Sequence, residues 1–292
     1  MIIWLASYPR SGNTLTRILM WRHFGLKSLS LYGDGESADI GAHLAPVVGF
    51  EPHGPLGQQS LAAMAAAPET FVVKTHEPPP PGCDWPAIYV VRDGRSAISS
   101  YWHYRNRPGQ PGPSLEEVVA GLVQFGSWSE HVAAWLDAPA VRRLVLRYED
   151  LARPSWATLK AIGDFLGRHP ADAPRPDFAA LQALAPDFFR VGDDARNAAE
   201  LEARCPALFN ALHGAVQARL GYPVARLQGE PALALAAEIR AMLAQRRQGT
   251  ASGLATLLAS VPLQAAPLRG PWRRALYAVR GLWRGRGRPP VQ

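Results

Sequence analysis

The stretch with the clearest chemical character is YPRSGNTLTR, residues 8–17, which lies between two apolar runs. A turn of Ser11 and Gly12 between a strand and a helix directs several backbone N–H groups to one place, with the positive end of the helix dipole behind them. Such a turn binds anions. A nucleoside-triphosphate loop carries a lysine directly after its glycine, whereas here Asn13 follows Gly12 and the cation, Arg10, precedes it. On this stretch alone, an ordinary strand-to-helix turn with an exposed arginine is an equal alternative.

The elements that must position these residues are short apolar runs that alternate with helical patterns. Continuous apolar strands alternating with helices indicate an α/β fold with a parallel sheet covered on both faces. The predicted strands are residues 2–7, 71–74, 87–91 and 144–148, and the helical patterns are 14–24, 96–105, 114–137 and 155–167. In the pattern 114–137, three apolar side chains share one helical face and are expected in the core: Trp128, Val132 and Trp135.

Three stretches are predicted to be surface loops: residues 33–57, 77–86 and 105–114. The second and third follow directly on two predicted strand-end motifs, so they should cover whatever binds at those strand ends. One strand end also carries Asp93, and a carboxylate there could bind magnesium. The arginine directly before it, Arg92, argues against that interpretation.

Composition limits the class of protein. A chain of 292 residues, of which 48% are hydrophobic, can bury a sizeable core. The two cysteines, Cys83 and Cys205, lie far apart, which supports neither a disulfide framework nor a zinc site. Arg10 interrupts the first apolar run early, and no uncharged apolar stretch of about 18 residues occurs. We therefore expect a cytoplasmic protein and predict no metal site.

The positive charge of the chain lies in its last part. The formal net charge is +7, but the ten arginines after Glu238 leave a net charge of −3 for residues 1–238. From about residue 231 the composition shifts to Ala, Leu and Arg. We predict a main domain over residues 1–230 and an Arg-rich, largely helical C-terminal extension over residues 231–292.

The extension contains one apolar stripe surrounded by arginines, formed by Trp272, Leu276, Val279 and Trp283. A basic helix of this kind is typical of peripheral contact with the inner face of a membrane. It is equally typical of a helix that docks on its own domain or on the second subunit of a homodimer. We predict no nucleic-acid binding, because the arginines are not part of a binding module in which aromatic residues alternate with basic ones.

Six motifs occur in order along the chain: YPRSGNT, VVKTHEP, YVVRDGRSAISSYWHY, WSEHVAAWL, LRYEDL and FFRVG. In this order and at about this spacing they resemble the sulfotransferases that use PAPS (3′-phosphoadenosine 5′-phosphosulfate), particularly the bacterial soluble type. The resemblance covers residues 1 to about 222. It implies a P-loop-like sulfotransferase fold that transfers a sulfonate group from PAPS to a hydroxyl group by in-line displacement. An amine is the alternative acceptor, PAP is the product, and no metal takes part.

In this family the first motif holds the 5′ end of the donor, which implies that role for Arg10, Ser11, Gly12, Asn13 and Thr14. Sulfonate transfer moves negative charge onto the leaving phosphate oxygen, so fixed N–H groups and a cation aimed there favour the transition state. The family usually has a lysine where this chain has Arg10. Arginine keeps the charge but gives up no proton, so we expect Arg10 to stabilise charge only.

His76 matches the catalytic base of the family. A histidine has an ordinary pKa of about 6.5, which lets it take a proton from an acceptor hydroxyl near neutral pH. Lys74, two residues earlier on an extended strand, points to the same face and resembles the lysine that assists at the transferring sulfonate. Six other histidines are expected to be core or solvent-exposed residues: His23, His43, His53, His131, His169 and His213.

The resemblance also implies residues for the nucleoside part of the donor. Arg92 and Ser100 match residues that bind the 3′-phosphate, for which an arginine fork and a hydroxyl are natural partners. Tyr148 corresponds to a position beside the adenine. Arg190 and Gly192 resemble a late loop that closes over the 3′-phosphate.

Besides Arg10, the chain departs from the family at two further places. After Arg190 the usual continuation is shortened to GDDARN and lacks its tryptophan, and Leu15 stands where many relatives have a tryptophan. These departures leave room for a non-catalytic module of the same fold.

Two alternative functions are considered. A nucleotide-dependent kinase would need a lysine after the loop glycine and a magnesium carboxylate. A non-catalytic nucleotide-binding module would not need Lys74 and His76. The acceptor, a small molecule, lipid or glycan with a hydroxyl, is not identified by the sequence.

Overall fold

The computed structural model describes residues 1–35, 41–80, 84–109, 112–138, 142–174, 177–186, 189 and 194–224. These residues form two compact units. The first contains residues 1–92 and 130–193, and the second contains residues 93–129 together with residues from 194 onward. The predicted extension, residues 231–292, lies outside the described residues, so its boundary and its apolar stripe stay predictions.

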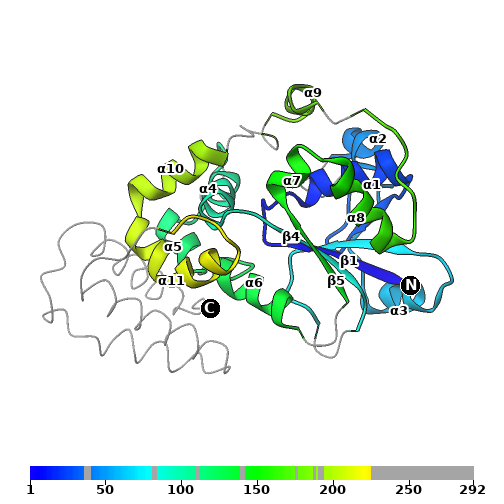
Figure 1. Cartoon of the computed structure of the whole chain (residues 1–292), viewed down its shortest axis with the longest axis horizontal. Helices are drawn as coiled ribbons and strands as arrows, with labels where there is room; N and C mark the ends of the chain where they lie inside the picture. The colour runs from blue at the N-terminus through cyan, green and yellow to red at the C-terminus, as the bar shows by residue number, and fades with distance from the viewer. Residues whose placement is uncertain are drawn as a thin grey trace, which may run out of the picture. The chain divides into compact units, whose positions relative to one another are not determined.

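The first unit is built on a five-stranded parallel sheet with the order β2-β3-β1-β4-β5 (Figure 1). Its strands are β1 (Ile2–Ser7), β2 (Ser28–Ser30), β3 (Phe71–Thr75), β4 (Ala87–Val91) and β5 (Arg143–Arg147). The central strand β1 has β3 on one side and β4 on the other. Because all strands are parallel, the three segments that follow β1, β3 and β4 leave the sheet at the same edge. The sheet therefore brings three of the sequence motifs to one edge.

Helices flank this sheet, which confirms the predicted α/β architecture. They are α1 (Asn13–Phe24), η1 (Ala42–Leu44), α2 (Ala45–Val48), α3 (Gln58–Ala66), α7 (Tyr148–Ala152), α8 (Trp156–Leu166), α9 (Phe178–Leu184) and, from residue 130, α6 (Trp128–Asp137). One hydrophobic cluster joins Leu5 and Val90 of the sheet to Leu19 of α1 and Ile162 of α8. Burial of this apolar area holds the sheet edge rigid beneath the loops.

The stretch 33–57 is not a plain surface loop, which corrects the sequence-based expectation. Leu44, Val48 and Phe50 are buried there and pack against Ile18 of α1. Their apolar side chains are separated by glycines and prolines, so no helical or strand period reveals them. The segment therefore contributes a second small core beside α1.

The pattern 114–137 does not form one helix. It splits into α5 (Leu115–Val119) and α6, with a turn region between them. Gly121 has φ 73°, a left-handed conformation that ends α5, and Gly126 has φ 70° in the turn region before α6. The prediction that Trp128, Val132 and Trp135 lie in the core is confirmed, since each is at most 1% exposed.

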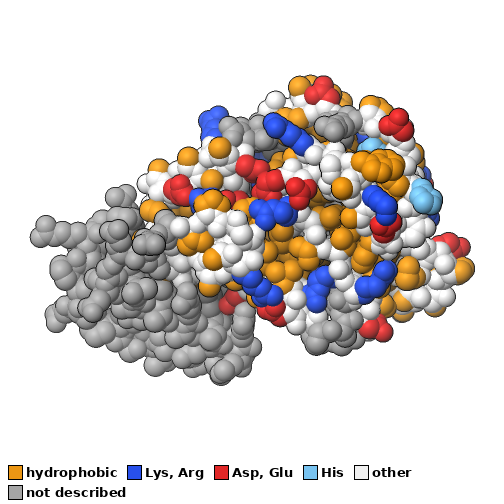
Figure 2. All heavy atoms as spheres, in the orientation of Figure 1, with side chains coloured by type: hydrophobic (Ala, Val, Ile, Leu, Met, Phe, Trp, Pro, Cys, Tyr) orange, Lys and Arg blue, Asp and Glu red, His pale blue; other side chains and the backbone are white. Residues whose placement is uncertain are grey.

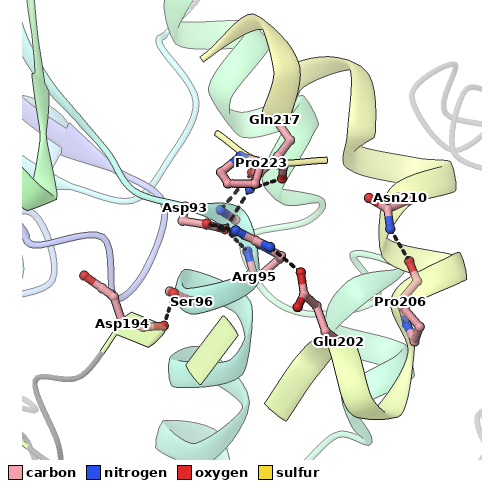
Figure 3. A network of polar contacts seen from close by, with 10 residues as sticks. Asp93, Arg95, Ser96, Asp194, Glu202, Pro206, Asn210, Gln217 and Pro223 are labelled. Atoms are coloured by element: carbon pink, nitrogen blue, oxygen red, sulfur yellow. Dashed lines mark hydrogen bonds and ion pairs between the residues drawn. The ribbon is translucent and has the colours of Figure 1, made fainter. Parts of the chain in front are cut away.

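The second unit consists of α4 (Gly94–Arg105), α5, α10 (Asp194–Arg204) and α11 (Pro206–Arg219) in its described part. The Asp93 carboxylate caps α4 by accepting from the Arg95 backbone N–H at 2.9 Å and also accepts from the Gln217 amide at 2.7 Å (Figure 3). The Arg95 guanidinium pairs with Asp93 and with Glu202. Both carboxylate oxygens of Asp93 are thus used within this network, which explains why it does not suit the magnesium role considered above.

Two observations concern the surface. No helix in the described part of the chain is long and apolar enough to cross a membrane. On the face shown in Figure 2, basic and acidic side chains are interspersed among apolar ones.

Candidate active site

The loop between β1 and α1 has an unusual backbone. Arg10 has φ 65° and Gly12, the N-cap residue of α1, has φ 103°. A left-handed arginine costs of the order of 1–3 kcal/mol, and such strain occurs mainly where a site depends on the conformation. The bend leaves Gly12 at the start of the helix, with the Thr16 N–H donating to the Gly12 carbonyl at 3.0 Å. The first N–H groups of α1 therefore have no acceptor within the helix.

The side chains of this loop fit an anion. Ser11 is 1% exposed, and its hydroxyl oxygen has no hydrogen-bond partner among the described residues. A buried hydroxyl of this kind costs free energy unless a ligand satisfies it. The Asn13 amide instead donates to the Leu5 carbonyl at 3.0 Å and to the Ser7 hydroxyl at 3.3 Å. We therefore expect Ser11 to contribute its side chain, and Asn13 its backbone N–H, to a bound anion.

The residues that directly follow β4 and β5, Arg92 and Tyr148, contact the same loop. The Arg92 guanidinium donates to the Arg10 carbonyl at 2.6 Å and lies 4.1 Å from the centre of the Tyr148 ring. A Cβ atom at Gly12 would lie only 2.7 Å from Cδ2 of Tyr148, so the ring packs directly on the loop backbone. The sequence-predicted residues Arg10, Gly12, Arg92 and Tyr148 are therefore brought together in one cluster.

His76 follows β3 and points to the end of β1. Its Nδ1 donates to the Ser7 carbonyl at 2.8 Å, which places the lone pair of the neutral ring on Nε2. The His76 backbone N–H donates to the Tyr32 hydroxyl at 2.8 Å, and the two rings stack with centres 6.0 Å apart. The Lys74 ammonium lies 5.3 Å from the centre of the same Tyr32 ring. Lys74 and His76 thus both lie beside the Tyr32 ring.

The surroundings of His76 keep its ring neutral. Burial lowers the pKa of His76 well below its ordinary value, and the positive charges of Lys74 and Arg10 lower it further. The hydrogen bond to the Ser7 carbonyl opposes this shift. Near neutral pH the ring therefore carries a lone pair on Nε2, which is the state required of a general base.

Three residues near His76 were missed by the sequence analysis as functional candidates. His131, expected to be a core or exposed histidine, is buried and donates from Nε2 to the His76 carbonyl at 2.9 Å. Trp135, expected in the core, donates from its indole nitrogen to the Glu77 carbonyl at 2.9 Å. Tyr32 lies in none of the six sequence motifs. The signal available for the first two was the motif WSEHVAAWL.

Four more residues were predicted for the site: Thr14, Ser100, Arg190 and Gly192. Ser100 lies on α4, in the second unit. Thr14 lies in the first turn of α1, next to the loop. Arg190 and Gly192 lie outside the described residues, so their roles stay predictions.

Comparison with known proteins gives one family. A family model described as "Sulfotransferase domain" matches residues 2–176. Mouse sulfotransferase 2A1 is 41% identical over 90 residues, 28% of this chain and 32% of the relative. Rabbit sulfotransferase 1C2 is 27% identical over 183 residues, 56% of this chain and 58% of the relative. The chain thus matches between about a third and somewhat over half of the length of these curated relatives.

Among solved structures, mouse sulfotransferase SULT7A1 complexed with PAP is similar with a TM-score of 0.53 and 20% sequence identity. The similarity covers 76% of this chain and 89% of that one. It shows a common fold, in agreement with the parallel sheet and its flanking helices.

Proposed function

Because the chain belongs to the sulfotransferase family, we propose that it transfers a sulfonate group from PAPS to a hydroxyl group of an acceptor and releases PAP. The observation that carries the proposal is the His76 ring, which donates from Nδ1 to the last residue of β1 and so presents Nε2 as a proton acceptor beside the anion loop. The related SULT7A1 structure contains PAP, which supports the choice of donor.

The donor would be held by groups that are already clustered. The Ser11 hydroxyl and the first N–H groups of α1 suit the 5′ end, with the positive charge of Arg10 beside them. Arg92, which lies against Tyr148, suits the 3′-phosphate, and the Tyr148 ring suits the adenine. No group of three or more His, Cys, Asp or Glu side chains that could hold a metal occurs in the described part of the chain.

In the proposed reaction, Nε2 of His76 takes the proton of the acceptor hydroxyl while its oxygen forms a bond to sulfur. The bond between sulfur and the phosphate oxygen breaks, and negative charge develops on that phosphate. Arg10 and the loop N–H groups would stabilise this charge, and Lys74 would stabilise the sulfonate oxygens. The positive charges also keep His76 neutral, so the same cations prepare the base and stabilise the leaving group.

The test is turnover by the His76→Ala variant. We expect it to lose most activity, since a general base contributes about 10²- to 10⁴-fold, and to bind PAP with nearly unchanged affinity. His169→Ala, which removes an exposed histidine, is the matched control and should behave as wild type. Turnover is measured with labelled PAPS and a panel of alcohols, phenols and amines, with product mass increased by one SO₃ group. Activity of the His76→Ala variant above a tenth of wild type would exclude His76 as the base.

A panel of acceptors is needed because the stretches 77–86 and 105–114, expected to shape the acceptor site, carry no diagnostic pattern. Calorimetric titration with PAP, against ATP, separates this proposal from a nucleotide-dependent kinase. Binding of PAP without turnover of any acceptor would favour the non-catalytic alternative.

A further inference from the structure

We propose that His131 is a positioning residue that fixes the peptide group of His76 and so aims the base. This inference rests on the proposed function, in which His76 takes the acceptor proton. His131 does not contact the reacting atoms itself. It acts through the backbone carbonyl of His76, and a contact of this kind cannot be predicted from the pattern of side chains in the sequence.

The contacts of His131 assign its tautomer. Nε2 lies 2.9 Å from the His76 carbonyl oxygen, and because a carbonyl only accepts, Nε2 carries the hydrogen. Nδ1 lies 2.9 Å from the Tyr89 hydroxyl. In the neutral ring Nδ1 has the lone pair, so the Tyr89 hydroxyl donates to it. The His76 carbonyl therefore fixes the tautomer of His131, and the Tyr89 hydroxyl supplies the donor that this tautomer needs at Nδ1.

The site keeps His131 neutral and immobile. Its side chain is buried, and burial lowers its pKa to about 4. The Tyr89 ring stacks on it with centres 5.8 Å apart, and the Tyr8 ring meets it edge-on at the same distance. Burial also raises the pKa of Tyr89, so its hydroxyl stays protonated and remains a donor. The hydrogen bonds from Tyr89 to His131 and from His131 to the His76 carbonyl are thus unchanged over the pH range in which His76 would work.

Two further contacts fix the same short segment. The Tyr32 hydroxyl accepts from the His76 N–H at 2.8 Å, and the Trp135 indole donates to the Glu77 carbonyl at 2.9 Å. The peptide groups on both sides of His76 are therefore held, while its ring is held by the Ser7 carbonyl. A general base must be fixed to a fraction of an ångström, and a displacement of about 1 Å can cost about 10²-fold in rate.

The alternative is that His131 only fills the core. His213 offers a matched comparison, because it is a buried histidine with the same pattern of partners: a carbonyl, that of Val119, at 2.8 Å and a hydroxyl, that of Ser129, at 2.6 Å. It belongs to the second unit and has no part in holding His76. Loss of His213 should lower stability without a selective loss of turnover.

The experiment compares His131→Leu, His131→Gln, Tyr89→Phe and His213→Leu. We expect His131→Leu to lower kcat about 10²-fold while the Kd for PAP stays unchanged. His131→Gln should recover most of the loss, since its amide can donate to the His76 carbonyl. Tyr89→Phe should give an intermediate loss. His213→Leu should reduce the urea midpoint but leave kcat within about twofold, since it touches no reacting group.

A second measurement is independent of turnover. Nitrogen-15 NMR of the histidine rings should show the hydrogen on Nε2 of His131 and on Nδ1 of His76 in the wild-type protein. If His131→Leu fails to fold, His131→Gln, Tyr89→Phe and this spectrum carry the test. A wild-type kcat retained by folded His131→Leu, or a His131 ring protonated on Nδ1, overturns the positioning role. Absence of wild-type turnover with the expected tautomers overturns only the proposed function.

Discussion

Replacing Ser11 with alanine tests whether its hydroxyl serves ligand binding or the stability of the fold. The Ser11 hydroxyl is buried and has no partner among the described residues, so it forms no hydrogen bond with them that would stabilise the free protein. An unsatisfied buried polar group costs about 1–3 kcal/mol. Ser11→Ala should therefore leave the free energy of unfolding unchanged or raise it by about 1 kcal/mol.

The effect on the ligand should have the opposite sign. A hydrogen bond from a hydroxyl to a charged phosphate oxygen contributes about 1.5–3 kcal/mol, so Ser11→Ala should weaken PAP binding by roughly 10- to 150-fold. The matched control is Ser155→Ala. The Ser155 side chain caps α8 by accepting from the Thr158 N–H at 3.1 Å. Its loss should cost about 1 kcal/mol of stability and leave PAP binding unchanged.

Urea unfolding with and without PAP, together with calorimetric titration, measures both quantities for each variant. The two serine variants should show opposite patterns: Ser11→Ala loses affinity and keeps stability, whereas Ser155→Ala loses stability and keeps affinity. If Ser11→Ala were destabilised by more than about 1 kcal/mol and still bound PAP normally, the hydroxyl would be structural and the assignment of the loop would be wrong.

Two further predictions concern charge. Arg92→Ala should weaken binding of PAPS by about 1.5–3 kcal/mol and binding of adenosine 5′-phosphosulfate, which lacks the 3′-phosphate, much less; equal losses in calorimetry would contradict its role at the 3′-phosphate. Because burial depresses the pKa of His131 to about 4, the unfolded chain binds more protons below pH 6.5, so stability should fall as the pH falls from about 6.5 to 4. His131→Gln should show a shallower fall in urea unfolding between pH 7 and pH 5; an identical slope would show that His131 does not titrate in this way.

The fold could be predicted where local pattern and tertiary role agree. The strands Ile2–Ser7 and Ala87–Val91 have the bounds that the sequence predicts, because a fully buried parallel strand is a continuous apolar run. The strand Ser28–Ser30 was not predicted, since three residues with alternating serines carry too little signal. The prediction of one helix over 114–137 was wrong for a different reason. The apolar period continues across Gly121 and Gly126, whose left-handed backbone interrupts the helix.

The sequence predicted those residues of the candidate site whose side-chain types form a motif. Arg10, Arg92 and Tyr148 occur in motifs, and the structure brings them together. Tyr32 and His131 hold the backbone of His76 rather than a ligand. Their partners are an N–H and a C=O that every residue possesses, so no spacing rule predicts these contacts, although His131 itself lies in the motif WSEHVAAWL.

The same reasoning links the two halves of the site through Ser7. Its carbonyl accepts from Nδ1 of His76, and its hydroxyl accepts from the Asn13 amide, which also holds the Leu5 carbonyl. Asn13 is the first residue of α1 and follows Gly12 directly, so the last residue of β1 is tied both to the base and to the anion loop. Ser7 is thus a backbone partner of the His76 ring as well as the end of the central strand. If the proposed function holds, we expect donor binding at the loop and orientation of the base to be coupled through this residue.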